Sequence, residues 1–139
     1  MTIYLVVSSL RRTKDWVEQA KGEFKAARDL FATSNYPWCC FACHQAAEKA
    51  LKAILEHFRS PTAGHNLIAL INEVSKFTDT SEEIEAACRT LNRYYIPTRY
   101  PNAFPSGAPV HMFNSDDAEE ALQHAGKVME LAGKVTGIT

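Results

Sequence analysis

The chain has 139 residues, of which 46% are hydrophobic and 22% are charged, and its formal net charge is −1 at pH 7. A chain of this length fits one domain and buries enough apolar surface to fold without a disulfide or a metal. The balanced charge excludes a general attraction to nucleic acid or to an anionic membrane, so any nucleic-acid function must depend on a local site.

The N-terminal segment, residues 1–12, reads MTIYLVVSSLRR and predicts an arm or extension in front of a single domain formed by residues 13–139. Residues 3–7 are β-branched and aromatic, so they fit a short strand, an ordered arm or an extension outside the domain. The apolar run is too short to span a membrane, and its arginines follow it, in the reverse order of a signal peptide. We expect a cytoplasmic protein without membrane association, in which the cysteines are free thiols.

Hydrophobic periodicity predicts five helices, at about residues 13–33, 37–59, 66–76, 80–95 and 115–135. The apolar stripe of the second helix consists mainly of cysteine and alanine, so a neighbouring helix can approach it closely. Thr80 and Glu83 have the spacing of a capping box at the start of the fourth helix. Acidic residues fill the first turn of the fifth helix, and Gly137 is a plausible stop for it.

A long loop separates the last two predicted helices, at residues 96–114. Prolines recur at positions 97, 101, 105 and 109, so neither a helix nor a central strand is expected there. Loops of this length are uncommon inside a compact domain and often have a function.

The segment CFACH places Cys40, Cys43 and His44 at the spacing of a c-type haem attachment site. Haem attachment requires export, however, and Cys43 lies on the apolar stripe of the second helix, where a thiol packs as a small hydrophobe. A zinc site would need a further ligand cluster. We therefore expect structural cysteines, no metal and no cofactor, and a surface position for His44; a metal, redox or haem role remains the alternative.

Two other histidines stand beside features that bind ligands. His65 precedes a predicted helix, whose N-terminal amides attract anions, and His111 lies in the long loop. For both residues a capping or packing role is the alternative.

Three segments together resemble the HEPN family: CHQAAEKALKAIL in the second helix, GHNLIALI after it, and LNRYYIPTRYPNAF before the last helix. The resemblance covers about residues 13–135. It implies an all-α, up-and-down antiparallel bundle of four long helices plus a shorter one, paired as a homodimer, and association with nucleotides or RNA. Many prokaryotic members work beside a small nucleotidyltransferase in toxin–antitoxin pairs, and the sacsin C-terminal branch is similar in its RYP loop.

Ribonucleases of this family have an arginine followed, after four to six residues, by a histidine that moves the proton of the RNA 2′-hydroxyl. Arg99 matches the arginine, but the possible histidine positions hold Phe104, Pro105 and Ser106. The resemblance therefore implies a site without its usual base. His111 and His65 are the possible substitutes, and geometry must decide whether either reaches the substrate.

The main hypothesis is a dimeric HEPN-like domain that binds a nucleotide, RNA or a nucleotidyltransferase partner through the Arg99 loop. A guanidinium can hold a phosphate, and aromatic faces can stack on bases. The candidate ligand-binding residues are Arg99, Tyr100, Asn102, Tyr94, Arg93, Lys52 and His65. Alternatively, Arg99 caps a helix or pairs with an acid. Two other functions remain: a metal-independent ribonuclease toxin, and a dimerisation domain of a larger co-chaperone-like assembly.

Overall fold

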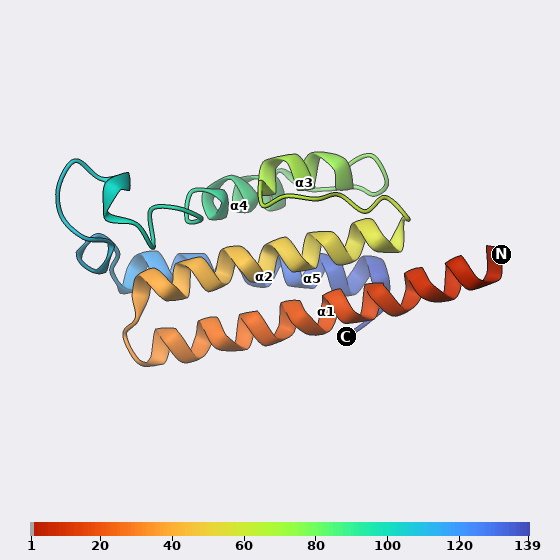
Figure 1. The fold of residues 1–139 in the computed structure, drawn as a ribbon, viewed down its shortest axis with the longest axis horizontal. Helices are drawn as coiled ribbons and strands as arrows, with labels where there is room; N and C mark the ends of the chain where they lie inside the picture. The colour runs from red at the N-terminus through yellow and green to blue at the C-terminus, as the bar shows by residue number, and fades with distance from the viewer. Residues whose placement is uncertain (1) are drawn as a thin grey trace.

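The computed structural model describes the backbone of residues 2–139 and the side chains of residues 12–139. The regular structure in this part of the chain is all helical, which confirms the predicted fold class (Figure 1). The α-helices are α1 (Thr2–Ala32), α2 (Tyr36–His57), α3 (Leu67–Val74), α4 (Glu82–Asn92) and α5 (Ser115–Thr136). Two 3-10 helices, η1 (Pro101–Ala103) and η2 (Pro109–His111), lie between α4 and α5.

Helix α2 lies at the centre of the bundle. It runs antiparallel to α1, packs against α5, and is covered on another side by α3 and α4 (Figure 1). Its buried positions are mostly alanine and cysteine, so the neighbouring helices approach it closely on several sides. The predicted core positions Cys39, Cys40 and Cys43 are confirmed as buried, and their thiols are free.

The N-terminal end of α1 differs from the prediction. Residues 3–7 belong to α1, so the short-strand alternative is wrong, and the helix continues without a break through the predicted start near residue 13. Its first turns extend past the end of α2 (Figure 1). The side chains of residues 1–11 lie outside the described ones, so the role of this extension stays a prediction. In the part of the chain that is described, no helix is both long and apolar enough to cross a membrane.

The helix ends show one wrong prediction and one confirmed one. Ser81, not Thr80, caps α4: its Oγ accepts a hydrogen bond from the backbone N–H of Ile84 at 3.1 Å. Thr80 instead donates to the carboxylate of Glu85 at 2.8 Å. The predicted stop of α5 is confirmed, because Gly137 has φ 72°, a left-handed conformation that glycine adopts without strain.

The loop between α4 and α5 lies at the end of the bundle where α1 turns into α2 (Figure 1). The expectation of no helix there is wrong for η1 and η2, which are single 3-10 turns that each begin at a proline. Proline suits a first helical position because the amide that it lacks would be unpaired there. Phe113 anchors the loop, since its ring lies 5.9 Å from that of Tyr94 and 6.4 Å from that of Phe104, both edge to face.

Candidate functional site

Arg99 is held rigidly by the turn that follows α4. Its Nε and Nη2 atoms donate to the backbone carbonyl of Tyr95 at 2.9 and 2.6 Å. The neighbouring Thr98 is buried and donates to the carbonyl of Tyr94 at 2.6 Å, which fixes the same turn. Among the described side chains, no carboxylate pairs with Arg99. Two of the five guanidinium N–H groups are used internally, and three remain for a ligand.

Three aromatic rings surround the Arg99 guanidinium. Its Cζ atom lies 4.2 Å from the ring centre of Phe41, 4.8 Å from that of Tyr95 and 5.0 Å from that of Tyr100. Each such cation–π contact contributes about 0.5–1 kcal/mol at an exposed site. The rings and the backbone bonds together fix the direction of the cation, so a ligand would meet a preorganised group.

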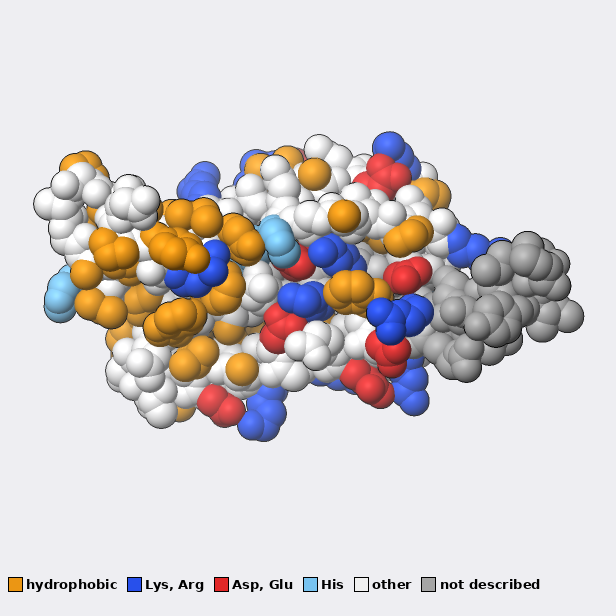
Figure 2. Space-filling model, viewed as in Figure 1, with side chains coloured by type: hydrophobic (Ala, Val, Ile, Leu, Met, Phe, Trp, Pro, Cys, Tyr) orange, Lys and Arg blue, Asp and Glu red, His pale blue; other side chains and the backbone are white. Residues whose placement is uncertain are grey.

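The surface around this cation is apolar. The exposed side chains are Trp38 at 48%, Tyr100 at 46% and Ile96 at 45%. Trp38 also packs edge-on against Phe41, with 6.1 Å between ring centres. Figure 2 shows hydrophobic side chains gathered around a basic group near the loop end of this face. We call this surface the Arg99 patch; it comprises Trp38, Phe41, Tyr95, Ile96, Arg99 and Tyr100.

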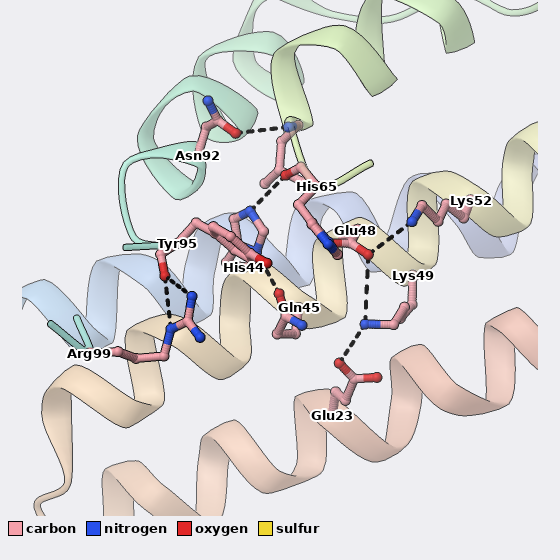
Figure 3. Close-up of polar contacts among 11 residues, drawn as sticks. Glu23, His44, Gln45, Glu48, Lys49, Lys52, His65, Asn92, Tyr95 and Arg99 are labelled. Atoms are coloured by element: carbon pink, nitrogen blue, oxygen red, sulfur yellow. Dashed lines mark hydrogen bonds and ion pairs between the residues drawn. The ribbon is translucent and has the colours of Figure 1, made fainter. Parts of the chain in front are cut away.

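His65 lies at the border of the Arg99 patch, stacked on Tyr95 (Figure 3). The two ring centres are 4.8 Å apart and the planes differ by 17°. Because the Arg99 Cζ is also 4.8 Å from the Tyr95 ring centre, the imidazole and the guanidinium are separated by at most twice that distance. The structure thus brings His65 and Arg99 together through one shared aromatic ring.

A buried carboxylate holds His65 in place. Glu48 on α2 is 2% exposed, and its Oε1 lies 2.8 Å from the His65 Nδ1 (Figure 3). Its Oε2 accepts from Lys52 at 3.0 Å and lies 3.8 Å from Lys49, which also pairs with Glu23 on α1 at 3.1 Å. Burial alone would raise the pKa of Glu48, but the hydrogen bonds from His65 and Lys52 and the nearby lysine charges lower it below its usual value. The carboxyl is therefore ionised at neutral pH.

His44 on α2 fixes the backbone of His65. The predicted surface position of His44 is wrong, because its side chain is fully buried. Its Nε2 is 3.0 Å from the His65 carbonyl oxygen, and its Nδ1 is 2.8 Å from the Gln45 side chain. Burial lowers the pKa of His44, so the ring is neutral and donates its Nε2–H to that carbonyl. The prediction failed because the 60–66 loop covers the face of α2 that was taken as exposed.

A groove of about 280 Å³ opens beside His65 and Tyr95, lined also by Asn66, Asn92, Ile96 and Pro97. Its walls are fixed by side-chain caps. The Asn66 side chain accepts from the first amides of α3, and the Asn92 side chain accepts from the Leu67 amide at 2.8 Å. Larger hollows of about 610 and 560 Å³ lie elsewhere, on faces that α5 shares with α4 and with α1. Neither contains a fixed histidine or an aromatic-caged cation, so the Arg99 patch and this groove form the candidate site.

The other predicted site residues form no described contact with Arg99. Lys52 pairs with Glu48, and Tyr94 turns inward toward Phe113, where burial raises its pKa. Three candidates are exposed on the loop or at its start, and no described side-chain contact joins them to Arg99 or His65: Arg93, Asn102 and His111. Phe104, at the motif histidine position, packs against Phe113.

Sequence reasoning missed four residues of α2 that build the site. Trp38, Phe41, Gln45 and Glu48 follow one another along α2 at steps of three and four, and Lys52 continues the series. This spacing defines a second face of α2, beside the cysteine and alanine stripe. The helical periodicity could have revealed that face, but only the structure shows that the Arg99 turn and the 60–66 loop cover it. The described residues contain no group of three or more His, Cys, Asp or Glu side chains suited to a metal ion.

The five-helix bundle and the arginine-centred loop define an all-α domain of the HEPN type. The HEPN domain family model matches residues 13–135, so the chain belongs to the HEPN family.

Known relatives agree with this assignment. The chain is 26% identical to the protein named "Putative toxin MJ1304" from Methanocaldococcus jannaschii, over 88% of this chain and 87% of that one. It is 29% identical to human sacsin over 78% of this chain, which corresponds to 2% of sacsin. The crystal structure of TT1696 from Thermus thermophilus superimposes with a TM-score of 0.87 and 35% identity, covering 89% of this chain and 98% of that one.

Proposed function

We propose that this HEPN domain binds a nucleotide or RNA through the Arg99 patch. The observation that carries the proposal is the state of Arg99: a guanidinium held by a backbone carbonyl and three rings, with no carboxylate partner among the described residues. The N–H groups that remain at its outer end can form two parallel bonds to one phosphate.

The exposed rings beside Arg99 supply the second part of a nucleotide site. Tyr100 and Trp38 are each close to half exposed, so their faces can stack on a base. Stacking contributes about 1–3 kcal/mol per base and does not depend strongly on base identity. Two lysines of α2 are neutralised internally, since Lys49 and Lys52 pair with Glu23 and Glu48. The proposed ligand therefore presents one phosphate group and one or two bases, rather than a dense run of negative charge.

Apolar surface outside the proposed ligand site, on the loop between α4 and α5, is available to protein partners. Val110 and Met112, 62% and 39% exposed, add apolar surface on the loop. We propose that the protein is a homodimer and that, like toxin–antitoxin members of its family, it works beside a small nucleotidyltransferase. The similarity to a protein named a putative toxin supports this partner assignment. A cytoplasmic location is part of the same proposal.

Calorimetric titration of the purified protein with adenosine monophosphate and with a short single-stranded RNA tests the ligand. We expect RNA to bind, and Arg99→Ala to weaken binding at least tenfold, as expected for a lost charge-assisted contact of about 1.5–3 kcal/mol. Arg28→Ala is the matched control, because Arg28 also lies over an aromatic ring, 4.9 Å from the centre of Phe24, but on the exposed side of α1. Absence of binding, or equal loss in both variants, would reject the proposal.

A further inference from the structure

We propose that a groove between α1 and α5 binds a free fatty acid, a molecule with one apolar chain and one carboxylate. The groove is the hollow of about 560 Å³ on the face that α5 shares with α1. It follows the C-terminal half of α5, whereas the loop that carries Arg99 precedes the first turn of that helix (Figure 1). The site is therefore separate from the Arg99 patch and adds a second ligand to the proposed one.

The interior of the groove is apolar and aliphatic. Its apolar lining comes from α1, α2, α5 and the segment after α5: Val17, Ala20, Ala50, Met129, Ala132 and Ile138. A hollow of this size is ordinary for a small-ligand site, which measures about 300–1,000 Å³. No aromatic ring lines it among the described residues, so the groove offers no stacking face for a base or another ring system. Walls of this kind suit an alkyl chain.

Two glycines of α5 keep the groove open. Gly126 and Gly133 both line it, and because they are two helical turns apart they lie on the same face of α5. Glycine inside a helix is less stable than alanine. The fold does not require it at either position, since an added β-carbon would meet only ordinary contacts: Phe24 Cζ at 3.7 Å from position 126, and the Ile138 carbonyl oxygen at 3.7 Å from position 133. The space that these glycines leave is thus available to another molecule.

The groove is elongated. Between Gly126 and Lys134 it follows α5 for about 12 Å, at 1.5 Å per residue. An extended chain advances about 1.2 Å per bond, so a chain of about ten carbon atoms has nearly this length. A medium-chain fatty acid would therefore place its methylene groups along the apolar walls, where their removal from water is favourable.

Charged side chains stand at the rim of the groove. Lys21 lies on the α1 wall, and Lys134 and Glu130 lie on the α5 wall; all three are exposed. Among the described side chains, no carboxylate forms an ion pair with either lysine. Two ammonium groups against one carboxylate favour a ligand that carries a negative charge, and each ammonium can hold a carboxylate that remains in water at the mouth of the groove.

Calorimetric titration with sodium decanoate tests the site, and decyltrimethylammonium, with the same chain and the opposite charge, is the comparison ligand. Both are used below their micelle concentrations. We expect decanoate to bind and decyltrimethylammonium to bind at least about threefold more weakly, the range of an exposed ion pair. Replacement of Lys21 and Lys134 together by alanine should remove this difference. The matched control replaces Lys14 and Lys25, exposed lysines of α1 outside the groove. Equal affinity for the two ligands in the parent protein would overturn the proposed ligand class.

Gly133→Leu tests the position of the bound chain. Its side chain would fill the groove and should weaken decanoate binding at least about tenfold. Gly22→Leu is the matched control, because Gly22 is also a helical glycine, has nothing within 4 Å of an added β-carbon and does not line the groove. Absence of decanoate binding to the parent, or undiminished binding to Gly133→Leu, would overturn the proposal.

Gly126→Ala supplies a readout that a purely structural glycine would not give. Alanine should raise the melting temperature by about 2–4 °C through its helix propensity and should weaken decanoate binding at the same time. A lower melting temperature would show that the fold itself needs the glycine, which would contradict the proposal.

The rival occupant of the groove is a second copy of this chain. Light scattering of the parent and of Gly133→Leu separates the two cases. We expect the same oligomeric state for both proteins and the same affinity for RNA at the Arg99 patch. Dissociation of the parent oligomer by Gly133→Leu would assign the groove to an interface between copies and overturn fatty-acid binding. Failure of RNA to bind, by contrast, would reject only the proposed function.

Discussion

Tyr95 contacts Arg99 in two ways at once: its backbone carbonyl accepts two hydrogen bonds from the guanidinium, and its ring centre lies 4.8 Å from the Arg99 Cζ. A substitution at position 95 removes the ring and leaves the carbonyl. The two contributions can therefore be separated by experiment.

Tyr95→Ala should weaken RNA binding about tenfold, because it removes a stacking face worth about 1–3 kcal/mol and the surface on which His65 rests. Tyr95→Phe keeps the ring and should bind as the parent protein does. Calorimetric titration of both variants measures the effect. Equal affinity of Tyr95→Ala and the parent would mean that the ring does not contribute to the ligand site.

Restoring the motif histidine is a second test of the site's position. Phe104 lies against Phe113, with 6.4 Å between ring centres, and not against Arg99. Phe104→His should therefore give no increase in RNA cleavage. It should also lower the free energy of unfolding by about 0.5–1.5 kcal/mol through loss of the aromatic pair. A gain in cleavage that depends on Arg99 would show that the loop rearranges to place position 104 at the phosphate.

Much of the fold was predictable, because the apolar residues that face the core of a helical bundle recur in the sequence with the period of the helix. The ends of α2, α3 and α5 lie within a few residues of the predicted ones. The burial of His44 and Glu48 was not predictable in this way. Both residues have polar neighbours in sequence, and Glu48 with Lys52 resembles an ordinary exposed ion pair at four-residue spacing. Both side chains are buried in the structure, where His65 of the 60–66 loop contacts each of them.

The candidate site was predictable by residue type but not by arrangement. Arg99, Tyr100 and His65 were named from the sequence. In the structure Arg99 and His65 both lie against the ring of Tyr95, and Tyr100 lies against Arg99. Tyr95 was not among the named candidates, and the fourth helix was predicted to run to about residue 95. The observed helix ends at Asn92, and the half-buried ring of Tyr95 lies against His65 and Arg99. Contacts of this kind depend on where a helix stops, which periodicity defines least well.

Acidification should destabilise the protein through His44. Its pKa is lowered by burial in the folded state, so the unfolded chain binds the proton more readily as the pH falls below the ordinary histidine value. Glu48 acts in the same direction at lower pH, because its pKa in the folded protein is also lowered. The stability that its carboxylate contributes is present above the usual carboxyl pKa and is lost as the pH falls toward the pKa of the folded state.

We therefore expect the melting temperature to fall between about pH 7.5 and about pH 5.5, on either side of the ordinary histidine pKa, and His44→Gln to reduce that fall. Glutamine can still donate to the His65 carbonyl but cannot take up a proton. His111→Gln, on the exposed loop, should retain the full pH dependence of the parent. Differential scanning calorimetry at both pH values measures these shifts. An unchanged pH dependence in His44→Gln would show that another group is responsible.

The cysteine cluster of α2 provides a stability test that is independent of the site. Cys40 and Cys43 are fully buried, and burial raises the pKa of Cys40 to about 12 and also raises that of Cys88 to about 12. A protonated thiol is a poor nucleophile, so thiol reagents should modify these residues only after unfolding.

Cys43→Ser should lower the free energy of unfolding by about 1–3 kcal/mol, because a hydroxyl replaces a weakly polar group in an apolar position. Cys43→Ala should cost less, since alanine adds no polar atom. Urea titration followed by circular dichroism compares the two variants. Similar stability of both, or fast modification of the native protein, would contradict a core position for these thiols.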